Sequence, residues 1–154
     1  MTHNILGIVK RLNGDPFDGI ATIRHGSRDI KVGITCDDQT FETSLNLAAL
    51  VVQRLEDLDK VAKQIAATDL CATYNNGWNE YDEVQDDDSL KTVTNPQLSM
   101  AEFEAKLSLN AVNVLGDRMI DFFYADDGMF WGHSIVVKSM NGVDLTGAWA
   151  ELFG

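Results

Sequence analysis

The sequence predicts an α+β fold that forms a single domain over residues 1–154. Alternating apolar residues near both ends of the chain indicate strands, whereas apolar residues spaced by three or four in the middle indicate helices. A chain of 154 residues with 45% hydrophobic residues has the size of one ordinary domain and can bury one sizeable core. We therefore expect an N-terminal antiparallel meander, a central helical hairpin and a C-terminal antiparallel sheet.

Three strands are predicted before the helices. Residues 5–11, 17–24 and 29–35 are the candidate strands, and every second residue is apolar in the last of these ranges. Turn sequences separate them, Asn-Gly-Asp-Pro at residues 13–16 and Gly-Ser at residues 26–27. Strands joined by such short turns pair as an antiparallel meander.

The middle of the chain has the period of helices. Apolar side chains recur at steps of three or four over residues 41–55 and again over residues 58–72. Asp38 or Thr40 can cap the first helix, and Asn-Asn-Gly at residues 75–77 is typical of a helix end. Because almost no residues separate the two patterns, we expect the second helix to follow the first directly.

Strands return in the last third of the chain. We interpret residues 79–96 as a long connection and a candidate flexible loop within the domain. Ser99 and Glu102 have the spacing of a capping box and predict a short helix that runs through Leu107. Four strands are expected after it, at residues 109–115, 118–124, 133–138 and 143–149.

The net charge is strongly negative and unevenly distributed. The chain carries 24 acidic and 12 basic residues, and residues 78–154 hold 14 of the acidic and 4 of the basic ones. Such a surface repels phosphate backbones, which disfavours nucleic acid as a partner, and attracts a basic protein partner. Solubility alone is the alternative explanation of the acidity.

Membrane and secretion signals are missing from the sequence. The N-terminal residues have neither the basic nor the apolar segment of a secretion signal, and no apolar run approaches the roughly 20 residues that span a bilayer. Two cysteines, Cys36 and Cys71, are too few for a disulfide framework, and we expect both to be reduced and buried. These features predict a cytoplasmic protein without a membrane partner.

Aromatic residues lie among the carboxylates of residues 78–88. Aromatic rings and carboxylates together suit the Arg and Lys side chains of a basic partner, through cation–π contacts and salt bridges. A solvated loop is the simpler interpretation. The candidate partner-binding residues of this stretch are Trp78, Glu80, Tyr81, Asp82, Glu83, Asp86, Asp87 and Asp88.

The densest local pattern is residues 124–134, which combine a tight turn with aromatic, acidic and histidine side chains. One interpretation is a partner-binding site at a hairpin tip. The other is a structural hairpin in which Phe130 and Trp131 fill the core and His133 bonds to a backbone carbonyl. The sequence leaves both interpretations open. The candidate site residues are Asp126, Asp127, Trp131 and His133.

Motifs for catalysis or cofactor binding are missing. The three histidines lie far apart, and the chain has no Cys-x-x-Cys, no His-Glu-x-x-His and no glycine-rich phosphate loop. We therefore expect no metal, no cofactor and no enzymatic activity. The alternative is a small hydrolase that uses His133 with Asp126 or Asp127.

Residues 126–135, Asp-Asp-Gly-Met-Phe-Trp-Gly-His-Ser-Ile, resemble the C-terminal signature of a bacterial family, domain of unknown function 2262. The resemblance covers roughly residues 29–154 and implies no established activity. Small acidic bacterial proteins of this kind are often similar to immunity proteins, which bind and neutralise a toxin. We therefore expect an acidic protein-binding module, most concretely an immunity protein. An accessory assembly subunit is a further alternative.

Overall fold

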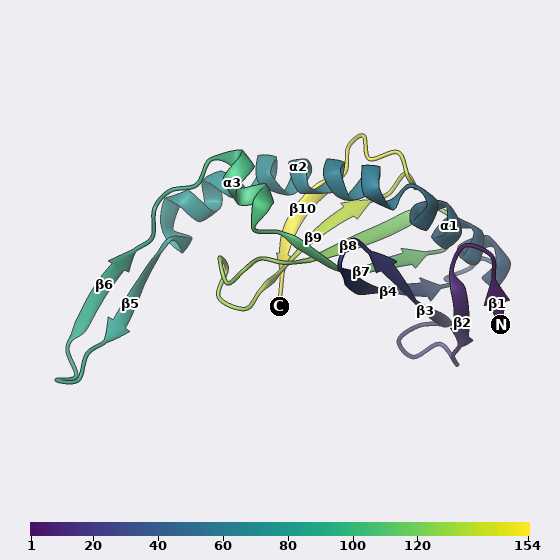
Figure 1. The fold of residues 1–154 in the computed structure, drawn as a ribbon, viewed down its shortest axis with the longest axis horizontal. Coiled ribbons are helices and arrows are strands. Elements are labelled where there is room, and N and C mark those ends of the chain that lie inside the picture. Colours follow the sequence, from purple (N-terminus) through teal and green to yellow (C-terminus); the bar gives the residue numbers. More distant parts are fainter.

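The computed structural model describes residues 1–154, and its main element is an eight-stranded sheet with two long helices over one face (Figure 1). A separate two-stranded hairpin extends from one end. The α+β class is confirmed. The helices are α1 (Phe41–Gln53), α2 (Leu55–Thr73), the short π-helix η1 (Tyr74–Trp78) and α3 (Met100–Ala105). The strands are β1 (Thr2–His3), β2 (Gly7–Arg11), β3 (Gly19–His25), β4 (Arg28–Thr35), β5 (Glu80–Val84), β6 (Leu90–Thr94), β7 (Ser108–Leu115), β8 (Met119–Ala125), β9 (Ser134–Ser139) and β10 (Trp149–Phe153).

Two antiparallel meanders make up the large sheet, and one parallel pair of strands joins them. The strand order is β1-β2-β3-β4-β7-β8-β9-β10, and β4 runs parallel to β7 with Val32 opposite Val112. The N-terminal meander and the C-terminal antiparallel sheet that the sequence predicts are both present, and the structure joins them into one continuous sheet. Parallel pairing requires a crossover of a dozen or more residues, which the helices and the small hairpin between β4 and β7 supply.

The helices α1 and α2 follow one another over the sheet. Thr40 caps α1, because its side-chain oxygen accepts a hydrogen bond from the Thr43 backbone N–H at 3.2 Å. Arg54 alone separates the two helices, and one residue is too short a link for the chain to reverse. The pair is therefore bent, not folded back into the helical hairpin that the sequence suggests (Figure 1). No helix combines the length and the apolar character that crossing a membrane requires.

The core lies between the helices and the sheet. On β8, Ile120, Phe122 and Tyr124 are fully buried in this core, whereas the residues between them are half-buried on the opposite face. Ala62 and Ala66 of α2 are fully buried as well, so the helix approaches the sheet closely. This period of two along the strands is the pattern from which the sequence predicts them.

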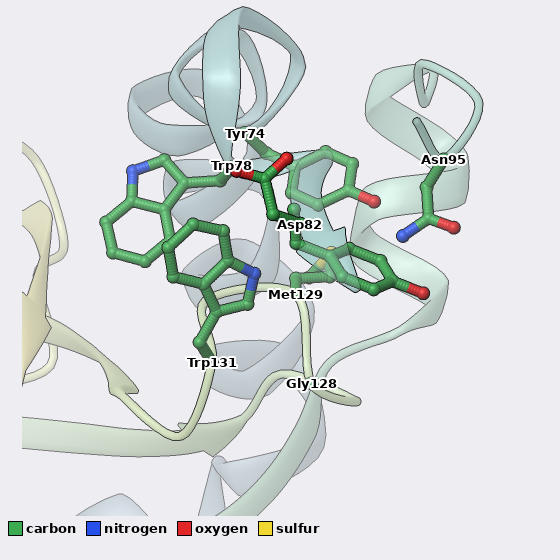
Figure 2. Close-up of a pocket in the computed structure, with 8 residues that line it drawn as sticks. Tyr74, Trp78, Asp82, Asn95, Gly128, Met129 and Trp131 are labelled. Atoms are coloured by element: carbon green, nitrogen blue, oxygen red, sulfur yellow. The ribbon is translucent and has the colours of Figure 1, made fainter. Parts of the chain in front are cut away.

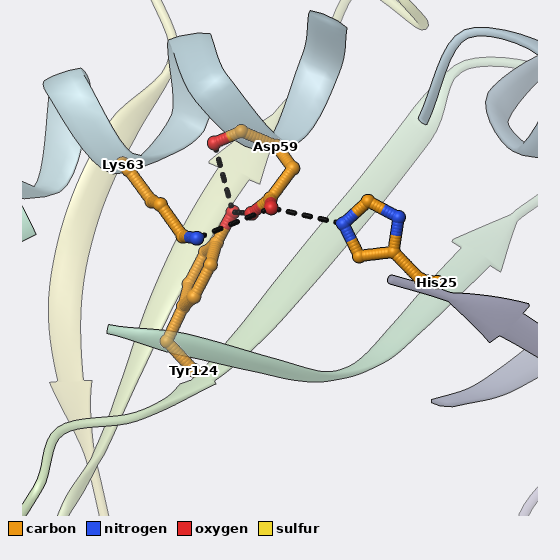
Figure 3. A network of polar contacts seen from close by, with 4 residues as sticks. All are labelled: His25, Asp59, Lys63 and Tyr124. Atoms are coloured by element: carbon orange, nitrogen blue, oxygen red, sulfur yellow. Dashed lines mark hydrogen bonds and ion pairs between the residues drawn. The ribbon is translucent and has the colours of Figure 1, made fainter. Parts of the chain in front are cut away.

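A buried polar cluster connects α2 to the sheet (Figure 3). The Asp59 carboxylate accepts a hydrogen bond from the Tyr124 hydroxyl at 2.8 Å, and it lies 3.0 Å from His25 Nε2 and 3.2 Å from Lys63 Nζ. Burial, and then the neighbouring Asp59, raise the pKa of Tyr124 far above its ordinary value. The phenol is therefore a neutral hydrogen-bond donor throughout the physiological range.

Two segments differ from the expectation. Residues 79–96 contain the hairpin of β5 and β6, and the pattern missed it because neither face of this hairpin is buried. Residues 143–149 were expected to form a strand, but residues 143–148 form turns and loop instead. Asp144 accepts the Thr146 backbone N–H at 3.0 Å and stabilises one of these turns, so the last strand begins only at Trp149.

Both cysteines are free, with Cys71 buried and Cys36 only half-buried. Burial raises the pKa of both thiols, and a hydrogen bond with Asp18 raises the pKa of Cys36 further. Since the thiolate is the reactive form, we expect both to react with iodoacetamide at about pH 7.5 more slowly than free cysteine. Asp18→Asn should accelerate labelling of Cys36 and leave Cys71 unchanged, as measured by mass spectrometry. Equal acceleration of both thiols would contradict the role of Asp18.

Candidate functional site

The end of α2 places Trp78 at the root of the β5–β6 hairpin. The last helical turn widens into the π-helix η1, in which Gly77 has a φ of 150°. Glycine adopts such a positive φ without the steric strain that a Cβ would cause, and the chain leaves the helix there. Trp78 is the next residue, so its position depends on this turn.

Asparagine side chains fix the root of the hairpin to α2. Asn75 bonds to both backbone groups of Leu98, donating to the carbonyl at 2.9 Å and accepting from the N–H at 2.8 Å. Asn79 is buried and donates to the Asn95 carbonyl at 3.0 Å. The two ends of the hairpin are therefore held by hydrogen bonds to side chains at the C-terminal end of the helix.

Asp126 shapes the loop between β8 and β9. Its carboxylate is buried and accepts the backbone N–H groups of Gly128 at 3.0 Å and of Phe130 at 2.6 Å. Asp127 and Gly128 both have a positive φ, so the chain turns tightly at this point. The loop places Phe130 in the core and Trp131 at the surface.

Phe130 is the fully buried centre of an aromatic cluster. Its ring centroid lies 5.3 Å from that of Trp78, 6.0 Å from that of Tyr74 and 6.2 Å from that of Phe103, and all three pairs are edge-to-face. Each such pair stabilises the fold by about 0.5–1.5 kcal/mol in addition to the gain from burying its apolar surface. The cluster therefore packs η1, α3 and the β8–β9 loop against one another.

An open cleft of about 520 Å³ lies between this cluster and the hairpin, and we name it the aromatic cleft. Figure 2 shows the indoles of Trp78 and Trp131 side by side, and their ring centroids are 4.7 Å apart. Tyr74 and Met129 are buried and form the floor. Asp82 is the one charged residue of the lining. The lining residues are Tyr74, Trp78, Tyr81, Asp82, Asn95, Gly128, Met129 and Trp131.

Trp131 has a backbone conformation that residues with a Cβ avoid. Its φ is 53°, in the left-handed region, and the residue is 58% exposed. The left-handed conformation costs a residue with a Cβ about 1–2 kcal/mol. Burial of the indole in the core does not offset this cost, because Phe130 occupies the core position next to it. Strain at an exposed aromatic residue is typical of a binding site.

The hairpin carries most of the free negative charge near the cleft, and we name residues 80–94 the acidic hairpin. It contains six carboxylates and one basic residue, Lys91. None of the six forms an ion pair. Asp82 accepts the Thr92 hydroxyl at 2.8 Å, and hydrogen bonds from Ser89 lower the pKa of Asp87. The six carboxylates are exposed and belong to Glu80, Asp82, Glu83, Asp86, Asp87 and Asp88.

The structure brings together two segments that the sequence presents as separate candidates. Trp78, Tyr81 and Asp82 meet Trp131 in the aromatic cleft, although they lie far apart along the chain. The remaining carboxylates of the acidic hairpin lie outside the cleft. Phe130 fills the core, as the structural interpretation of this hairpin expects, whereas Trp131 is exposed and does not fill the core.

Asp126 does not fit the partner-binding role predicted for it. Its carboxylate is buried and both oxygens bond to backbone N–H groups, so it positions the loop instead. Four lining residues, Tyr74, Asn95, Gly128 and Met129, were not predicted. Met129 lies within the pattern of residues 124–134 but is an ordinary apolar residue there, Asn95 belongs to no motif, and Tyr74 continues a helical pattern, so residue type does not mark any of the three as a site residue. The Gly at position 128 next to Met129 is the only local signal.

His133 has no carboxylate partner. Its Nδ1 lies 2.7 Å from the Phe130 carbonyl oxygen, and its ring packs 5.5 Å from that of Trp78. Asp127 is exposed and lies 3.4 Å from Lys106, while Asp126 bonds to the backbone. The pair that a hydrolase alternative requires is therefore not assembled. No group of three or more His, Cys, Asp or Glu side chains is arranged to hold a metal ion.

Comparison with known proteins identifies a family. No curated protein and no solved structure matches the chain. Residues 10–148 match the family DUF2262, which is described as an uncharacterized protein conserved in bacteria. The matched range includes the acidic hairpin and every residue that lines the aromatic cleft. The chain therefore belongs to the bacterial family DUF2262.

Proposed function

We propose that this protein is a binding module that captures a basic segment of a partner protein. The observation that carries the proposal is the acidic hairpin, which projects from the body of the fold and holds six carboxylates without an ion pair (Figure 1). Fixed charges on a projecting element attract a cationic partner and raise its association rate at low salt. The adjoining cleft supplies apolar contact once the partner has arrived.

The acidic hairpin also has the form of a contact element. Strands β5 and β6 pair only with each other, so each keeps a free backbone edge that can accept a strand of a partner. Val84 and Leu90 are opposite each other near its tip and are 66% exposed. An isolated two-stranded hairpin is only marginally stable in water, and a partner that covers it would stabilise it.

An immunity protein is the most concrete form of this function. Membership of a bacterial family and a formal net charge of −12 support it. A toxin that acts on nucleic acid needs a basic surface, and an acidic module can cover such a surface by charge complementarity. In this proposal the acidic hairpin meets the basic surface and the aromatic cleft receives one of its side chains.

The test compares two variants that lose the same number of negative charges. The first carries Glu83→Gln, Asp86→Asn and Asp88→Asn on the acidic hairpin. The partner to test is any toxin-like protein encoded next to the gene for this protein, and calorimetric titration measures the dissociation constant. We expect binding to weaken about 10- to 100-fold, because each exposed charge contributes up to about 1 kcal/mol.

The matched control carries Asp15→Asn, Asp38→Asn and Asp117→Asn, all exposed positions away from the hairpin. It should bind as tightly as the natural protein. The affinity of the natural protein should also fall as salt rises from about 50 to 300 mM, because salt screens exposed charges. Absence of a complex, equal loss in both variants, or indifference to salt would each overturn the proposal.

A further inference from the structure

The aromatic cleft has the chemistry of a site for an organic cation. Four aromatic side chains line it, from Tyr74, Trp78, Tyr81 and Trp131, and Asp82 is its one charged residue. Aromatic faces attract a cation through their quadrupole, and a carboxylate beside them balances its positive charge. A neutral apolar ligand would gain nothing from Asp82 and would leave the carboxylate partly desolvated.

Polar atoms of the cleft remain available to a ligand. One carboxylate oxygen of Asp82 accepts the Thr92 hydroxyl at 2.8 Å, which orients the group and leaves its second oxygen free of protein partners. The Asn95 side chain has no hydrogen bond within the protein, and only its backbone groups bond to Asn79. In Figure 2 Asp82 lies beside Trp78 and above Trp131, and Asn95 lies on the side of the cleft away from the two indoles.

The positive φ of Trp131 is a second, independent sign of a ligand. The loop holds this residue in the left-handed region while leaving it 58% exposed, beside a Trp78 ring 4.7 Å away. Asn or Gly would adopt this φ with less strain, so the backbone alone gives no reason for an indole. The indole supplies an exposed aromatic face next to Trp78, which neither Asn nor Gly would supply.

We propose that the aromatic cleft receives the guanidinium group of an arginine side chain from the basic partner, an inference that rests on the proposed function. A guanidinium is planar and weakly hydrated, so it can stack on an indole while its N–H groups donate in its own plane. Those donors suit the carboxylate of Asp82 and the amide oxygen of Asn95. A lysine ammonium is a compact, strongly hydrated charge and interacts less favourably with the same aromatic rings.

The experiment uses the natural protein and a short probe, the peptide acetyl-Gly-Arg-Gly-amide. The chain has three tryptophans, and their indole N–H groups give three signals in a nitrogen–proton correlation spectrum. Trp78 and Trp131 lie in the cleft, whereas Trp149 lies on β10 and is an internal control. We expect the peptide to shift the two cleft signals in a saturable way and to leave the Trp149 signal in place.

Variants and analogues separate the cleft from general charge. Trp131→Asn and Asp82→Asn should each weaken the peptide at least about tenfold, while Asp86→Asn, the same charge change at the hairpin tip, leaves the affinity unchanged. Citrulline, which keeps the shape but lacks the charge, and lysine in place of arginine should each bind at least about tenfold more weakly. Thermal melting shows whether each variant is folded, and Trp131→Asn should melt no lower than Asp86→Asn.

The outcomes distinguish this inference from the proposed function. Equal affinity for the lysine and arginine peptides, or an affinity that survives Trp131→Asn, overturns the guanidinium site. Saturable, arginine-selective binding of the peptide supports the guanidinium site. If the protein binds the peptide in this way but binds no basic protein, only the proposed function is overturned. A partner protein that binds tightly while none of the peptides shifts the cleft signals overturns the guanidinium site and leaves the proposed function standing.

Discussion

Replacing Asp59 with alanine is expected to lower the free energy of unfolding by about 2–4 kcal/mol. Asp59 is 7% exposed, and its carboxylate is the shared partner of Tyr124, His25 and Lys63. The substitution leaves the buried Tyr124 hydroxyl without its best acceptor and removes the link between α2 and β8. Denaturant titration followed by circular dichroism measures the change.

The matched control is Asp29→Ala, because Asp29 also pairs with a basic side chain but in solvent. Its side chain is 65% exposed and lies 3.0 Å from Arg24, so the loss should stay below about 1 kcal/mol. Asp59→Asn retains an oxygen that can accept the Tyr124 hydroxyl and should fall between the two. A similar cost for Asp29→Ala and Asp59→Ala would show that the buried cluster does not hold α2 to the sheet.

Replacing Phe130 with alanine should cost about 3–5 kcal/mol, because the substitution leaves a cavity among well-packed rings. Phe130 is fully buried and contacts the rings of Trp78, Tyr74 and Phe103. Tyr74 and Trp78 of the aromatic cleft pack on the Phe130 ring and lose this contact in the variant. We therefore expect the variant also to fail to bind an arginine peptide. Thermal unfolding and the indole signals measure the two effects separately.

Two further substitutions show whether the cost comes from packing. Phe130→Leu keeps most of the volume and should cost less than about 1.5 kcal/mol. Phe153→Ala removes a ring of the same kind that is 60% exposed, and it should cost no more than about 1 kcal/mol. A Phe130→Ala variant as stable as Phe153→Ala would contradict the buried position of the Phe130 ring.

The elements that the sequence predicts well are those with one buried face. Residues 29–35 alternate because one face of β4 meets the core, and residues 41–55 repeat every three or four because one side of α1 does. The hairpin of β5 and β6 has no buried face, so its strands leave no pattern. The pairing of β4 with β7 could not be predicted from the sequence either. The register between two strands so far apart in the chain depends on how the helices pack on the sheet, and not on either strand alone.

The candidate site could likewise be predicted only in part, because its assembly depends on tertiary packing. Trp78 and Trp131 can each be singled out from their acidic and aromatic neighbours, but their contact depends on how α2 and the β8–β9 loop pack. Asp-Asp-Gly predicts a turn without showing which aspartate is buried, and the structure buries Asp126 and exposes Asp127. Asp59 follows two other acidic residues in the first turns of α2, so its residue type alone did not reveal its burial.

The parallel pair of β4 and β7 has a consequence during synthesis on the ribosome. Strand β4 is complete at Thr35, but β7 begins at Ser108, so residues 36–107 must be translated before the two can meet. At about 5–20 residues per second this delay is roughly 4–14 s. For that time one edge of β4 is unpaired backbone that a neighbouring nascent chain can join. The unfinished chain therefore exposes a strand edge that the finished protein covers, and a chaperone that binds the nascent chain during this time would protect it.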